Sequence, residues 1–193
     1  MMPKKTILLS ALVVALAQIG FLGWMIMARA AVLRDGREVL LKVEPVDPRD
    51  LLRGDYVRLG YEISSIPAHL FRNVDEAGIG PDVDVTVRLS RQSDGFWHAT
   101  DAWIGQSVAG AATEAVDISG KTTSGFFGSE DNQVVSIDYG LERFYLPEGE
   151  GLAIERDMRT RNFGIKAAVA GDGTSQIKAL MDGDTLLFEE PFY

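Results

Sequence analysis

The hydrophobic and polar positions divide this chain into two unlike parts. Residues 6–28 form one uncharged, apolar run in which Gln18 is the one strongly polar side chain. As a helix rising about 1.5 Å per residue, residues 7–28 would span roughly 33 Å, enough to cross the ~30 Å hydrocarbon core of a bilayer. Lysines precede the run and Arg29 follows it. The pattern predicts a transmembrane helix over residues 6–28.

Two other interpretations of this run are weaker. A cleavable signal peptide has a shorter apolar core, of about 7–15 residues, although Ala28-Arg29-Ala30 matches the pattern of its cleavage site. A buried helix of a soluble protein is rarely apolar on every face over such a length. We therefore expect an uncleaved single-pass anchor, preceded by a tail at residues 1–5 and followed by a stalk at 29–36.

The orientation of the anchor rests on the character of its tail. Positive groups lie on both sides of the run, so their count does not decide which side faces the cytoplasm. A short tail with two lysines resembles the start of an export signal, and long C-terminal domains cross membranes largely regardless of flanking charge. We expect the tail in the cytoplasm and the domain at residues 37–193 on the periplasmic or extracytoplasmic side.

Beyond the stalk, apolar side chains recur at every second position, which is the period of a half-buried β-strand. The clearest run is residues 83–89, and the turn signal at 92–95 predicts a hairpin with residues 96–103. Further strands are expected at residues 39–44, 57–63, 135–141, 165–170, 176–181 and 185–188. Short helices are expected at 67–74 and 151–159. The predicted fold class is mainly β: one N-terminal transmembrane helix followed by a single, mostly antiparallel β domain with one or two short helices.

Composition narrows the functional classes. The chain has no cysteine, which excludes a structural disulfide, a thiolate zinc site and a thiol nucleophile. Its net charge of −9 argues against a nucleic-acid-binding surface. Residues 29–193 carry 17 basic and 28 acidic side chains, so this part of the chain has a net charge of −11. Anionic headgroups repel such a domain, which is expected to stand off the bilayer surface.

Residues 45–63 combine turn chemistry with strand alternation. Asp47 before Pro48 fits a helix N-cap, so a single helical turn is expected there. Gly54 and Asp55 favour a turn at the start of the next strand. Alternation then puts four apolar side chains on one face of that strand: Val57, Leu59, Tyr61 and Ile63. The opposite face carries Tyr56, Arg58, Gly60 and Glu62.

The residues Gly54-Asp55-Tyr56, followed by Leu59 and Tyr61, resemble the motif that names the GDYXXLXY family of membrane-anchored bacterial proteins. The segment YGLERFYLPEGEG at 139–151 and the N-terminal anchor are also similar to that family. The resemblance implies a protein of the bacterial cell envelope, held in the inner (cytoplasmic) membrane, and it implies no particular activity. It also implies a partner, a multi-spanning membrane protein.

The polar face of the motif strand is the first candidate for a binding site. Tyr56 offers a flat contact and Arg58 a bidentate donor, which together suit a peptide or a glycan. Asp55 and Tyr61 belong to the same motif and complete this candidate site. The alternative is an ordinary solvent-exposed strand face whose Gly and Asp make the turn.

A second candidate for binding is Arg143. Strand alternation places it between Leu141 and Tyr145 on the apolar face, where an unpaired charge would cost several kcal/mol. An ion pair with Asp55 or Glu155 would stabilise this charge. Alternatively, a register slip at the end of the strand would change the face on which Arg143 lies. The functional alternative is an arginine that binds a ligand beside Tyr145.

The main rival to a binding domain is a membrane-anchored hydrolase of peptides or glycans. Glu148 and Glu150 could supply an acid and a base near Arg143, although solvated turns are the better explanation of these glutamates. The anchor and the GDYV strand entry also resemble type I signal peptidases, which use a serine–lysine dyad. Residues 46–53 contain no serine, however, and no lysine follows closely, so the sequence does not favour that chemistry.

Metal chemistry is not indicated either. His69 and His98 are isolated, without a second histidine or a carboxylate at ligand spacing. Asp172, Asp182 and Asp184 lie at Asp-Gly turns and do not match a calcium loop. We therefore predict no metal, no cofactor, no catalytic residue and no nucleic-acid partner. The leading hypothesis is a non-enzymatic binding or scaffolding domain, tethered to the envelope.

Overall fold

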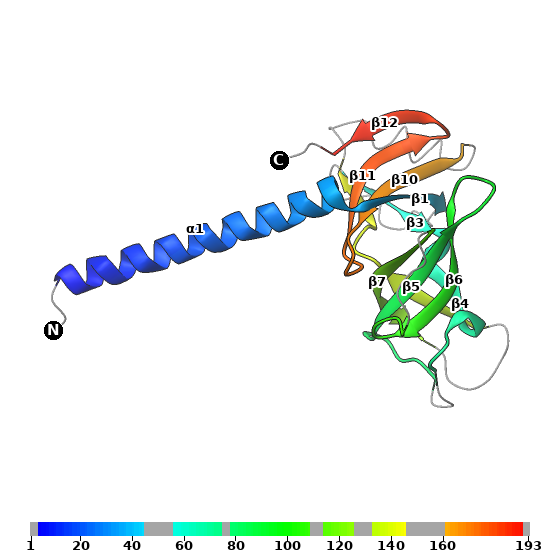
Figure 1. The fold of residues 1–193 in the computed structure, drawn as a ribbon, viewed down its shortest axis with the longest axis horizontal. Helices are drawn as coiled ribbons and strands as arrows, with labels where there is room; N and C mark the ends of the chain where they lie inside the picture. Colours follow the sequence, from blue (N-terminus) through cyan, green and yellow to red (C-terminus); the bar gives the residue numbers. More distant parts are fainter. Residues whose placement is uncertain are drawn as a thin grey trace.

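The computed structural model of the protein describes residues 4–44, 56–74, 78–108, 114–125, 133–145 and 161–190. Helix α1, Lys4–Asp35, extends away from the rest of the chain as a single rod (Figure 1). It is long and apolar enough from Leu8 to Asp35 to cross a membrane, and the protein buries none of its most apolar stretch. The helix runs past the predicted end at Ala28, so the expected stalk is a continuation of α1.

The connection between α1 and the domain is a single residue. Strand β1, Arg37–Glu44, begins directly after Gly36, whose N–H donates to the Val32 carbonyl at 2.9 Å. Leu33 is buried, with 2% of its surface exposed, where the last turns of α1 lie against two strands of the domain. A side chain at Gly36 would collide with the Val32 oxygen and lie 3.1 Å from the Val169 nitrogen. Close packing therefore requires glycine at this junction.

The first sheet has the strand order β12-β11-β10-β1-β3, and all its pairs are antiparallel. Its strands besides β1 are β3 Gly60–Tyr61, β10 Phe163–Val169, β11 Ser175–Asp182 and β12 Thr185–Glu189. The predicted C-terminal meander is thus confirmed, with strand ends shifted by one or two residues. The β10–β11 turn at 170–174 closes with hydrogen bonds between Ala170 and Thr174 and between Gly173 and Ala170.

The second sheet has the order β4-β8-β7-β5-β6 and is also antiparallel. Its strands are β4 Ser65–Pro67, β5 Asp84–Arg91, β6 Trp97–Ile104, β7 Ala115–Ser124 and β8 Val134–Asp138. The predicted β5–β6 hairpin is confirmed. Strands β4 and β7 were not predicted. The helix predicted over 67–74 was wrong: only Ala68–Leu70 forms a single 3-10 turn, η2, after a proline that pairs in β4.

A short ribbon forms the third sheet, where β2, Tyr56–Arg58, pairs with β9, Arg143–Tyr145. The strand predicted over 57–63 is therefore divided between β2, β3 and the 3-10 turn η1, Glu62–Ser64. It divides because β2 pairs with β9 whereas β3 pairs with β1. The helical segments predicted at 47–52 and 151–159 lie outside the described residues.

One hydrophobic core joins the two larger sheets. It contains side chains from the first sheet, such as Leu41 and Ile165, and from the second, such as Val87 and Ile118. The tip of the β10–β11 hairpin also touches the second sheet, because the Ser119 N–H of β7 donates to the Gly173 carbonyl at 3.0 Å. The hairpin tip thus extends the first sheet onto the middle of β7 (Figure 1).

Candidate functional site

The inward face of the motif segment is part of the core. Leu59, Tyr61 and Ile63 are each at most 3% exposed, as the alternation predicts. The Tyr61 hydroxyl donates to the Leu141 carbonyl at 2.5 Å, and in return the Tyr139 hydroxyl donates to the Ile63 carbonyl at 2.7 Å. Two buried tyrosines therefore join the motif to residues 139–145 in both directions. Tyr61, one of the predicted binding residues, therefore lies in the core.

The outward face of the β2–β9 ribbon brings together the other candidate residues. Arg58 lies directly opposite Arg143, and Tyr56 directly opposite Tyr145. Arg58 and Arg143 are both exposed, and Tyr145 is 66% exposed, while Phe144 between them is buried. Because residues opposite each other in an antiparallel pair share a face, Arg58, Arg143 and Tyr145 form one exposed surface, here called the arginine face. Asp55 lies outside the described residues.

The prediction that Arg143 lies on the apolar face was wrong. Strand β8 ends at Asp138, and the chain bends through Gly140, which has a φ of +75°, before β9 begins. Because β9 pairs with β2, its alternation starts afresh and Phe144 takes the inward position. The register slip that was one of the explanations offered for Arg143 therefore occurs between β8 and β9. Asp55 and Glu155, the expected ion-pair partners, lie outside the described residues.

A pair of carboxyl groups lies at the same bend. The Glu142 side chain accepts a hydrogen bond from the Tyr139 N–H at 2.7 Å, and the Asp138 side chain accepts one from the Gly140 N–H at 2.8 Å. Burial, and then the hydrogen bond to Asp138, raise the pKa of Glu142 to about 7. No sequence pattern pointed to this pair, although its members are four residues apart. Glu142 can therefore hold a proton near neutral pH.

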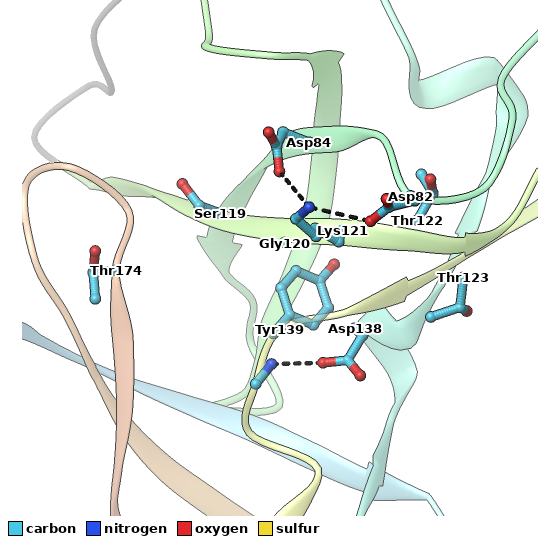
Figure 2. Close-up of a pocket in the computed structure, with 11 residues that line it drawn as sticks. Asp82, Asp84, Ser119, Gly120, Lys121, Thr122, Thr123, Asp138, Tyr139 and Thr174 are labelled. Atoms are coloured by element: carbon cyan, nitrogen blue, oxygen red, sulfur yellow. Dashed lines mark hydrogen bonds and ion pairs between the residues drawn. The ribbon is translucent and has the colours of Figure 1, made fainter.

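An open hollow of about 600 Å³ lies beside this bend, between β7, the segment after β8 and the β10–β11 hairpin (Figure 2). At its rim, the Lys121 ammonium lies 3.1 Å from Asp82 and 3.6 Å from Asp84. The hydrogen bond to Asp82 raises the pKa of Lys121, which keeps this amine protonated and unsuited to act as a base. The lining comes from separate segments, so no local sequence pattern identified it.

His98 corrects another prediction, because it is not isolated. Its Nδ1 lies 2.6 Å from Glu62 and its Nε2 lies 2.9 Å from Asp94. Burial lowers the pKa of His98, but these two hydrogen bonds outweigh burial and raise it. Lys42 lies 3.5 Å from the other oxygen of Glu62. The histidine thus links the motif segment to the β5–β6 hairpin, and the four-residue spacing from Asp94 was the available signal.

Two of the aspartates at Asp-Gly turns have partners within the protein. The Asp172 carboxylate accepts a hydrogen bond from the Thr174 N–H at 2.9 Å within its own turn, and Asp182 pairs with Arg161. Within the described residues, no group of three or more histidine, cysteine or acidic side chains is placed to hold a metal ion. Glu148 and Glu150, the candidates for hydrolase chemistry, lie outside the described residues.

Comparison with known proteins agrees with the motif. The family model described as "GDYXXLXY protein" matches residues 18–180, which is most of the chain. No curated protein and no solved structure matches it. The matched range includes the second half of the apolar helix, the second sheet, the β2–β9 ribbon and the first sheet except β12 and the end of β11.

Proposed function

This chain belongs to the GDYXXLXY family, and we propose that it is a membrane-anchored, non-enzymatic binding or scaffolding protein of the bacterial cell envelope. In this proposal α1 spans the inner membrane once and the β domain lies on the periplasmic or extracytoplasmic side. The domain binds an envelope partner through the arginine face. A multi-spanning membrane protein, as the family resemblance implies, is the partner we expect.

The apolar helix supports the anchoring part of the proposal. Its large side chains from Leu8 to Met27 are exposed, many of them by more than half, although such side chains are normally buried in water-soluble proteins. A lipid bilayer would cover all of them at once. The net charge of −11 on residues 29–193 keeps the β domain itself off anionic headgroups.

The arginine face is the observation that carries the binding part. Two arginines lie directly opposite each other on neighbouring strands, so two positive charges share one exposed face. Guanidinium groups bind carboxylates with two parallel hydrogen bonds. Tyr145 adds an exposed ring beside them. This surface suits a peptide segment of the partner protein that carries carboxylate groups.

Crosslinking in the living bacterium, followed by purification of the full chain, tests the binding proposal. We expect an envelope component to co-purify with the wild type, and Arg58→Glu to reduce its recovery about tenfold, as the loss of one charged hydrogen-bonded contact predicts. Arg91→Glu is the matched control, because Arg91 is another exposed arginine at the end of β5 and should leave recovery unchanged. Recovery of no envelope component, or equal recovery with both variants, would contradict the proposal.

A second experiment tests the orientation independently. Alkaline phosphatase fused to the C-terminus is active only when it is exported, so an active fusion supports an external domain. An inactive fusion that is still membrane-bound would place the domain in the cytoplasm. That result would overturn the orientation and leave the binding surface to be tested on the other side.

A further inference from the structure

Gln18 lies at the centre of the apolar helix. Residues 7–28 form the predicted span, so this side chain is about 16 Å from either end of it at 1.5 Å per residue. A glutamine side chain is too short to reach headgroups or water from that depth. In the membrane proposed above for α1, its carboxamide would therefore lie in hydrocarbon.

Nothing in the described part of the chain satisfies this carboxamide. Among the residues described, the Gln18 side chain makes no hydrogen bond, and the protein buries none of the apolar helix around it. Figure 1 shows that α1 extends away from both sheets over this stretch. A polar group without a partner in hydrocarbon is strongly unfavourable. The partner must therefore come from another molecule.

The side chains that share a face with Gln18 allow another helix to approach closely. Ala11 and Met25 lie seven residues before and after it, and Ala15 and Leu22 lie three and four residues away, on the same side of the helix. We call these five residues the Gln18 face. Alanines at a helix contact let two backbones come close, which is how membrane helices pack.

We propose that two copies of this chain pair in parallel through the Gln18 face, with their Gln18 carboxamides hydrogen-bonded to each other. Copies of one chain insert in the same orientation, so residue 18 lies at the same depth in both helices. A carboxamide carries a donor and an acceptor, which makes it complementary to a second copy of itself across a two-fold axis. A single polar residue in such a seam also fixes the register of the pair.

The inference rests on the membrane anchor of the proposed function but not on the arginine face. It gives that function a new property, because pairing would present two arginine faces from one assembly. A partner with two binding sites would then bind with higher avidity than to one copy.

The absence of cysteine from the chain makes a direct test possible, since each introduced cysteine is the sole thiol. The full chain would be expressed in bacterial membranes with one cysteine on the Gln18 face, Ala11→Cys or Met25→Cys. Leu9→Cys and Leu16→Cys are the matched controls on the opposite face of α1. Mild oxidation and a non-reducing gel then separate the 21.1 kDa chain from a disulfide-linked pair.

We expect pairs from the two positions on the Gln18 face and about tenfold fewer from the controls. Adding Gln18→Leu should reduce the pairs about tenfold, as loss of interhelical hydrogen bonds predicts, whereas Gln18→Asn, which keeps a carboxamide, should retain most of them. Equal crosslinking at all four positions, or no effect of Gln18→Leu, would overturn the proposal. A Gln18-dependent product that contains a different protein would also overturn it.

Alkaline extraction of the same membranes separates the two possible failures. A chain that stays in the membrane pellet without forming pairs refutes only the pairing. A chain released into the soluble fraction refutes the anchor, and with it both proposals.

Discussion

Tyr61 and Tyr139 show at the scale of single residues what the family motif does. Each hydroxyl donates to a main-chain carbonyl of the other segment, and both side chains are at least 94% buried. The Leu59 N–H adds a third bond, to the Glu142 carbonyl at 2.9 Å. The apolar members of the motif thus hold β2 and β9 in register, and this register sets the two arginines opposite each other.

Removing either tyrosine hydroxyl should lower the stability of the folded protein, although only one oxygen atom is lost. Tyr61→Phe or Tyr139→Phe leaves a buried carbonyl without its donor, so we expect each to lower the free energy of unfolding by about 1–2 kcal/mol. Urea denaturation of the detergent-solubilised chain would measure the loss. Ser93→Ala, in an exposed turn, is the control and should change little. A loss no greater than that of the control would show that these hydroxyl bonds do not stabilise the protein.

Glu142 should make stability depend on pH. Burial and Asp138 raise its pKa to about 7 in the folded protein, above that of an unfolded chain. Folding therefore favours the protonated form: the stabilisation is complete below the unfolded pKa and is lost as the pH rises through about 7. Glu142→Gln keeps an oxygen for the Tyr139 N–H and stays neutral. The pair is partly exposed, so solvent screens it. We therefore expect the free energy of unfolding of this variant, relative to that of the wild type, to be about 1 kcal/mol higher at pH 8 than at pH 5.

Thermal unfolding of the wild type and Glu142→Gln at both pH values would measure this difference. His98 also has a raised pKa, but it is present in both proteins and cancels in the comparison. Glu44→Gln changes an exposed carboxylate and should leave the pH profile of the wild type intact. Parallel profiles for the wild type and Glu142→Gln would refute the assignment.

At the scale of elements, the junction between α1 and β1 depends on Gly36. A methyl group there would collide with the Val32 carbonyl and crowd the Val169 nitrogen, both of them main-chain atoms that cannot move alone. We expect Gly36→Ala to lower the free energy of unfolding by about 1–3 kcal/mol, the usual cost of overpacking. Gly80→Ala is the matched control because no atom lies within 4 Å of the added methyl group. Denaturation midpoints of the two variants that coincide would contradict this account of the junction.

Strands with clean alternation and a clear turn were predictable from the sequence, and the β5–β6 hairpin and the C-terminal meander are the examples. Strand β7 alternates too, with Val116, Ile118 and Thr122 buried, yet Gly120 resembles a loop residue. The structure shows why glycine is needed there: a Cβ would lie 2.6 Å from a methyl carbon of Ile137. Packing against β8 imposes that choice, and no local pattern reveals it.

The candidate site was predictable only in part, for a similar reason. Arg58, Arg143 and Tyr145 could be identified singly as exposed or unusual side chains. That they share one face depends on the pairing of β2 with β9, two strands far apart in the sequence. The bend at Gly140 also resets the alternation, which is why Arg143 was placed on the wrong side. The hollow near Lys121 draws on still more segments and left no signal in any of them.

At the scale of the whole molecule, the two large sheets share one core and also touch where the β10–β11 hairpin tip contacts β7. Gly173 has a φ of +87°, and a Cβ there would collide with the Ser119 side chain. Gly95 has nearly the same φ, +88°, but open space around it. Both alanine variants incur about 1–2 kcal/mol of backbone strain, and only Gly173→Ala adds the collision, at about 1–3 kcal/mol more. The difference between the two variants in free energy of unfolding, measured by denaturation, gives the contribution of the contact between the sheets. Equal losses in the two variants would show that this contact is dispensable.

The one-residue connection after α1 also fixes which way the domain points. Each residue of an α-helix turns the chain by about 100°, so one residue inserted between Arg29 and Asp35 would swing the whole domain about a third of the way around the axis of the helix. Seven inserted residues, close to two full turns, would bring it back almost to its original heading while raising it by about 10 Å. The number of residues in α1 therefore determines in which direction around the helix axis the arginine face points.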